Sequence, residues 1–252
     1  MRPAVAAVNI VLGLVYTSYG IMTIVDMKRG WKTMGFSHFG MAWIAMAFTC
    51  GPHHLEHGLH VAFAGRAGGP LDLFAVVVGF PAGVIWFLLR VEALAGGRGD
   101  RFISATPRWV AALPALSAVY VGLLGAGAIA VLRSGASFGP KLTPNVLLLA
   151  VYSLIGYYLL RTQLANRGPL GGWSVSGLAL TVVFPTCGLM HAVYATYATA
   201  ARYDVDIHGL TIDWLSVPAA IYFVWVVRSL YLGAFRDWNR GSVGAQLASA
   251  VA

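Results

Sequence analysis

Histidines cluster in one short segment, Thr49 to His60, which reads Thr-Cys-Gly-Pro-His-His-Leu-Glu-His-Gly-Leu-His and contains four of the chain's seven histidines. Imidazole is a good ligand for zinc, copper and iron, whereas magnesium and calcium prefer oxygen. Residues three, four and seven apart share one face of a helix. If the segment is helical, it therefore presents two neighbouring stripes of ligands, one with His53, Glu56, His57 and His60 and the other with Cys50, His54 and His57.

A second segment repeats part of this pattern, because Thr49-Cys50-Gly51 matches Thr186-Cys187-Gly188 and His54 matches His191 at an offset of 137 residues. Other matches keep the same order at offsets of 136 to 137 residues. They pair Asn9, Val15, Tyr16, Gly20, Gly40, Ala42, Pro81 and Ala82 with Asn145, Val151, Tyr152, Gly156, Gly177, Ala179, Pro218 and Ala219. Such matches predict an internal duplication.

The predicted site is a transition-metal centre shared by the two segments, with zinc, copper or iron as the ion. Its candidate ligands are His53, His54, His57, His60 and His191. Zinc held by three protein ligands and a water is a hydrolytic centre. Glu56 or Asp213, if left uncoordinated, is then the candidate catalytic base on the metal-bound water. Haem is the alternative cofactor, with His54 and His191 as axial ligands.

Cys50 and Cys187, the chain's two cysteines, leave three interpretations open. With His54 and His191 they can form a Cys2His2 site, although Pro52 weakens this geometry because proline kinks a helix. They can pair as a disulfide. They can also be small buried packing residues.

The composition indicates that these residues are positioned by membrane helices. Of 252 residues, 58% are hydrophobic and 10% are charged, against roughly 25% charged in soluble domains. A membrane-spanning helix needs roughly 20 apolar residues, and seven such runs are present. They are Ala4–Val25, Gly35–Ala64, Leu71–Leu94, Trp109–Leu132, Asn145–Leu164, Trp173–Ala200 and Asp213–Phe235.

The predicted fold is an all-α integral membrane protein of seven transmembrane helices in one domain. Residues 1–95 and 144–236 form two parallel three-helix repeats, residues 108–133 form a linker helix, and residues 237–252 form a cytoplasmic tail. Basic residues concentrate on the side of the C-terminus, which places that end in the cytoplasm and the N-terminus outside. They are Lys28, Arg29, Lys32, Arg98, Arg101, Arg108, Arg161, Arg167, Arg228, Arg236 and Arg240.

This topology places the histidine cluster near the extracytoplasmic face of the cell membrane, where Asp204 and Asp206 can add ligands or attract a cation. The net charge of +8 is then explained by topology and anionic lipid, and no nucleic-acid partner is expected. The preferred function is a membrane-embedded metalloenzyme, a hydrolase or oxidoreductase, acting on a lipid or another apolar molecule. The alternatives are a transporter of a metal ion or small solute, and a haem-binding redox or accessory subunit that contacts a quinone-like ligand and a membrane-complex partner.

Overall fold

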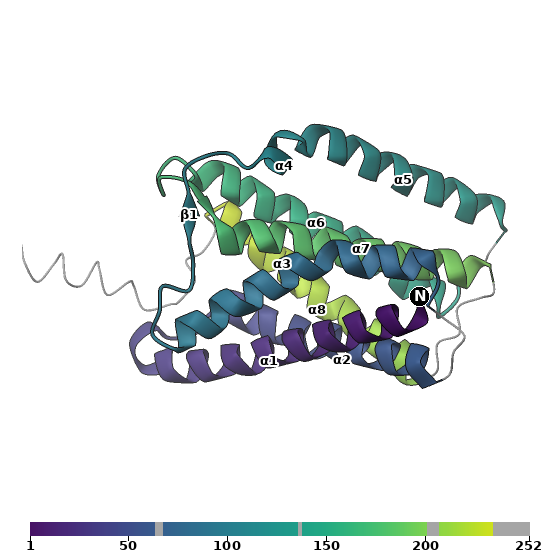
Figure 1. Cartoon of the computed structure of the whole chain (residues 1–252), viewed down its shortest axis with the longest axis horizontal. Coiled ribbons are helices and arrows are strands. Elements are labelled where there is room, and N and C mark those ends of the chain that lie inside the picture. Colours follow the sequence, from purple (N-terminus) through teal and green to yellow (C-terminus); the bar gives the residue numbers. More distant parts are fainter. Residues whose placement is uncertain (64–67, 136–137, 201–206, 234–252) are drawn as a thin grey trace, which may run out of the picture.

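The computed structural model describes residues 1–63, 68–135, 138–200 and 207–233, which form an all-helical bundle (Figure 1). The predicted tail at 237–252, as well as Asp204 and Asp206, lie outside these residues. The helices are α1 (Arg2–Met34), α2 (His38–Phe63), α3 (Pro70–Leu94), α4 (Arg108–Ala111), α5 (Leu113–Arg133), α6 (Leu142–Asn166), α7 (Val175–Thr199) and α8 (Ile207–Tyr231).

Six helices in the described part of the chain are long and apolar enough to cross a membrane: α1, α3, α5, α6, α7 and α8. The chain is therefore a multi-pass membrane protein by its helix content. The remaining long helix, α2, has 26 residues but is not among the six, because its histidines and Glu56 lower its hydropathy. The predicted fourth run is interrupted after Ala111, and α5 begins anew with Pro114 in its first turn.

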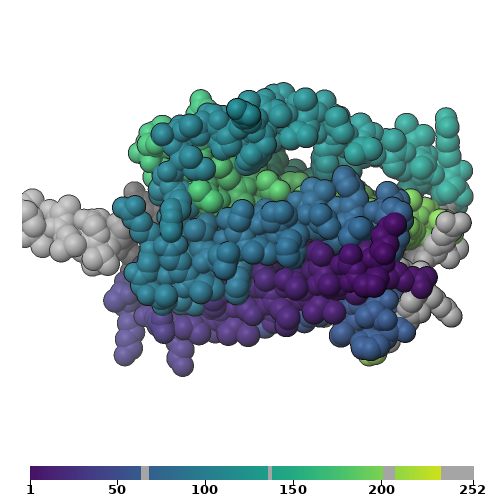
Figure 2. Space-filling model, viewed as in Figure 1, coloured from purple at the N-terminus to yellow at the C-terminus, as the bar shows by residue number. Residues whose placement is uncertain are grey.

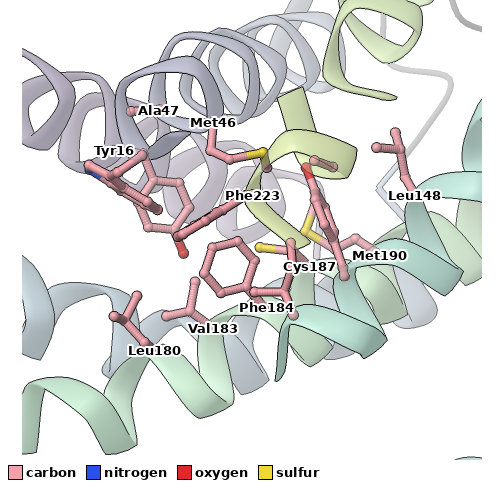
Figure 3. Close-up of a cluster of buried hydrophobic side chains, with 14 of the residues drawn as sticks. Tyr16, Met46, Ala47, Leu148, Leu180, Val183, Phe184, Cys187, Met190 and Phe223 are labelled. Atoms are coloured by element: carbon pink, nitrogen blue, oxygen red, sulfur yellow. The ribbon is translucent and has the colours of Figure 1, made fainter. Parts of the chain in front are cut away.

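The helices pack in two similar groups. α1 packs most extensively on α2 and also on α3, while α6 packs on α7 and also on α8. The groups meet where α3 contacts α7 and where α2 contacts α8. A single large apolar core lies between them, and Figure 3 shows Phe184 and Phe223 at its centre with the sulfur atoms of Cys187 and Met190 close by. Both repeated segments, in α2 and α7, therefore contribute side chains to this core.

Glycines allow α1 and α2 to lie close together. A Cβ atom added at Gly13 would lie 2.8 Å from the Gly51 carbonyl oxygen, and one added at Gly58 would lie 3.0 Å from the Ala6 carbonyl oxygen. Real Cβ atoms essentially never approach another atom more closely than 3.0 Å, and a contact at 3.0 Å is already tighter than nine in ten real ones. The glycines thus bring Asn9 and Tyr16 of α1 next to the histidine segment of α2.

α5 lies along one edge of the bundle, with an opening between it and the other helices for part of its length (Figure 2). None of its residues is buried. Its apolar surface is therefore suited to contact with lipid.

A short pair of strands lies at the end of the bundle opposite His60. β1 (Phe102–Ile103) pairs antiparallel with β2 (Trp173–Ser174). Beside it, the Asp100 carboxylate accepts hydrogen bonds from the Ser174 hydroxyl (2.6 Å) and from the Ser176 backbone N–H (3.0 Å). An acidic group at the start of α7 satisfies N–H groups that have no partner within the helix.

Candidate metal centre

Three side chains from α2 and α7 form a group that can hold a metal ion: Cys50, His54 and Cys187. Each offers one ligand atom, and these atoms all lie within 4.8 Å of one another. Both cysteines are free thiols. Cys50 and Cys187 lie within one residue of the midpoints of their helices. The group is therefore centred nearer the middle of the bundle than the sequence predicted.

The His54 imidazole is oriented by a hydrogen bond that it donates to a residue of the preceding helix. The Asn9 amide nitrogen donates to the Val5 carbonyl oxygen over 2.9 Å, so its Oδ1 atom faces His54 Nδ1 at 2.7 Å. Because Oδ1 accepts only, Nδ1 carries the proton and donates it. The other ring nitrogen, Nε2, then keeps its lone pair, as a metal ligand requires.

The second group of helices contains the same arrangement around His191. The Asn145 amide nitrogen donates to the Lys141 carbonyl oxygen over 2.8 Å, and Asn145 Oδ1 lies 2.7 Å from His191 Nδ1. Tyrosine rings also lie in matching places, because Tyr16 is 5.5 Å from the His54 ring and Tyr152 is 5.4 Å from the His191 ring. Both histidines are thus held in the tautomer that leaves Nε2 available.

A small cavity of about 10 Å³ is lined both by the three-residue ligand group and by His191. Its volume is about that needed for one water molecule, so it suits a single ion and offers no room for a porphyrin. The structure therefore gives no support to the haem alternative. The lining residues are Cys50, His53, His54, Tyr152, Cys187, Met190, His191 and Ser216.

His53 and Asp213 form a buried pair beside the cavity. His53 Nδ1 lies 2.9 Å from Asp213 Oδ1, and the Asp213 side chain is fully buried. The pair joins α2 of the first group to α8 of the second. Asp213, predicted as a catalytic base, thus contacts a histidine that lines the cavity.

The other predicted site residues lie further along α2. His57 is buried, with its ring 5.1 Å from that of Tyr194, whereas Glu56 and His60 are half-buried. In the described part of the chain none of the three lines the cavity. His57 Nε2 and His60 Nε2 have no hydrogen-bond partner among the described residues. Their roles as ligand or base stay predictions.

The sequence pattern alone did not distinguish the thiols as ligands and assigned no role to the asparagines. The cysteines are part of the only three-residue ligand group found in the described residues, although packing was an equally open interpretation. Asn9 and Asn145 were recognised as matching positions, but their contacts with His54 and His191 depend on how α1 and α6 pack. The signal that singles them out is a polar residue at equivalent places in two apolar helices.

In comparisons with known proteins, no family model, no curated protein and no solved structure matches the chain.

Proposed function

We propose that this protein binds one soft transition-metal ion, zinc or copper(I), between its two helix groups and carries it across the membrane. Cys50, His54 and Cys187 are the first ligands, and His191 completes the set. The observation that carries the proposal is the convergence of the three ligand atoms within 4.8 Å. Thiolate ligands select zinc and copper(I) among the common metals, and imidazole suits both.

Four protein ligands close a metal site, whereas a catalytic zinc keeps a position for water or substrate. The cavity of about 10 Å³ has no space for a lipid ester group. A lipid-hydrolysing enzyme is for this reason a weaker proposal than it was from the sequence. Transport of the ion itself needs no larger cavity.

Buried and half-buried histidines lead from the site toward one end of the bundle. His53 lines the cavity and lies beside Asp213, and His57 and His60 follow on α2. From His54 to His60 the route covers roughly 9 Å at 1.5 Å per residue. Ionisable groups inside membranes are costly and usually mark an ion or substrate pathway.

The location of the site also supports transport of the metal ion. In many secondary transporters the substrate binds near the bilayer midplane at the interface of structural repeats. The matched Asn-His-Tyr arrangements support the proposed duplication into two parallel three-helix repeats, and the positive-inside bias of the sequence places the His60 end outside. An ion then enters from the extracytoplasmic side through the histidines.

The test uses sealed proteoliposomes that contain a metal-sensitive dye. With zinc or copper(I) added outside, the wild type is expected to give saturable uptake. Cys187→Ser should abolish it, because serine cannot replace the thiolate ligand. His38→Ala is the matched control. His38 lies at the start of α2, away from the cavity, and its side chain forms a hydrogen bond with Tyr222 of α8. Uptake no faster than in empty liposomes, with metal still bound stoichiometrically, would reject transport and retain the site.

A second function is supported by the His53 and Asp213 pair alone. A carboxylate that holds an imidazole in place next to a metal is an arrangement for general base catalysis. If zinc-loaded protein hydrolyses short-chain ester substrates and Asp213→Asn removes this activity with zinc content unchanged, the enzyme interpretation is favoured. Absence of zinc-dependent hydrolysis rejects it.

A further inference from the structure

Two neighbouring cavities lie at the end of the bundle opposite His60, beyond the apolar core. The larger has a volume of about 370 Å³ and the smaller about 200 Å³. Tyr19, Phe39 and Arg90 line both. Small-molecule sites typically have volumes of 300 to 1,000 Å³, so the larger cavity alone reaches the size of a ligand-binding site.

The walls of these cavities are aromatic. The rings of Tyr19 and Trp86 stack with centroids 4.0 Å apart, and Trp43 lies edge-on to Trp86 at 4.1 Å. Phe39 adds a fourth ring. Flat conjugated molecules pack well on such surfaces, in offset-stacked and edge-to-face arrangements.

Two buried N–H groups of the cavity walls have no acceptor among the described residues: Trp43 Nε1 and Arg90 Nε. Both residues line the smaller cavity. Buried donors are nearly always satisfied in proteins, and leaving one without an acceptor costs free energy. A ligand that brings oxygen acceptors removes this cost.

Charge in the cavities favours a neutral ligand. The Arg90 guanidinium forms an ion pair with the Asp26 carboxylate through its NH2 group, so an anion would have to compete with Asp26. The Arg90 Nε proton is not used by that pair. A carbonyl oxygen can therefore accept from Nε without disturbing the ion pair.

We propose that these cavities bind a lipid-soluble quinone, whose ring packs against Trp86 and Tyr19 and whose carbonyl oxygens accept hydrogen bonds from Trp43 and Arg90. A quinone combines a flat ring, two carbonyl acceptors, no charge and an apolar tail. The proposal does not rest on the metal centre, because these two cavities share no lining residue with the cavity at Cys50, His54 and Cys187.

Flow dialysis of radiolabelled decylubiquinone against purified full-length protein in detergent tests the site. The wild type is expected to bind one molecule per chain saturably. Trp43→Phe keeps an aromatic ring, although a smaller one, and removes the N–H donor. The Kd should then rise roughly five- to tenfold, as expected for the loss of one buried hydrogen bond. Trp31→Phe is the matched control, because Trp31 is 53% exposed and lines neither cavity.

Arg90→Lys is a second variant that preserves the positive charge beside Asp26 but lacks Nε, and it should weaken binding to a similar degree. Displacement by menadione, a ring with the same carbonyls, supports the proposal. Equal displacement by decanol would show a nonspecific apolar pocket, and tighter binding of oleate would show an anion site; either overturns it. Unchanged zinc content in Trp43→Phe separates this test from that of the metal centre.

Discussion

At the residue scale, the proposed metal centre depends on asparagines that fix the tautomers of two histidines. Asn9 and Asn145 each use the amide nitrogen on a backbone carbonyl and present the oxygen to a histidine at 2.7 Å. The histidine must then donate from Nδ1. Groups that orient metal ligands in this way commonly contribute 10- to 100-fold to metal affinity.

Asn9→Ala is therefore expected to lower zinc affinity by roughly 10- to 100-fold without changing the cysteines. The loss arises because His54 can then rotate or protonate at Nε2. Competition with a chromophoric chelator measures the change in Kd. Asn166→Ala, an exposed position at the end of α6, is the control. An Asn9→Ala protein with wild-type affinity would show that Asn9 does not control how His54 binds the metal.

At the element scale, glycine contacts between α1 and α2 set how closely Asn9 approaches His54. Gly13→Ala would bring its Cβ within 2.8 Å of the Gly51 carbonyl oxygen. Overpacking of this kind typically costs about 1–3 kcal/mol. We expect Gly13→Ala to lower the unfolding temperature in detergent and to weaken metal binding together.

Gly122→Ala provides the contrast on α5, because a Cβ there has no neighbour within 4 Å among the described residues. Alanine favours a helix over glycine by up to about 1 kcal/mol, so this variant should be as stable as the wild type or more so. Equal destabilisation by both substitutions, measured by thermal unfolding, would show that the α1 and α2 contact is not tight.

The sequence predicted the helical elements better than their ends and contacts. Apolar length located the helices because lipid requires long apolar runs, but α1 extends to Met34 through polar residues and α5 restarts after Ala112. His54 and His191 were predicted as candidate ligands from their repeated spacing, and the structure brings His54 together with the two cysteines. The pairing of His53 with Asp213 joins residues 160 positions apart, and only packing of α2 on α8 creates it.

At the scale of the whole molecule, the proposed ion joins the two helix groups, because Cys50 and His54 belong to one and Cys187 and His191 to the other. Binding to the folded protein alone stabilises it by about 2.7 kcal/mol when free metal is 100 times the Kd. The unfolding temperature should consequently rise on addition of zinc.

Cys50→Ser should abolish this rise, because it removes a ligand from one group, while His38→Ala should preserve it. Differential scanning fluorimetry with and without a chelator measures both. An equal rise in Cys50→Ser would place the stabilising metal elsewhere.

The most direct test of the central claim is X-ray absorption spectroscopy at the metal edge of protein loaded with one equivalent of zinc. The account predicts a shell of two sulfur ligands at about 2.3 Å and two imidazole nitrogens at about 2.0–2.1 Å. Cys50→Ser should lose one sulfur contribution. A shell made only of nitrogen and oxygen in the wild type would contradict the proposed site.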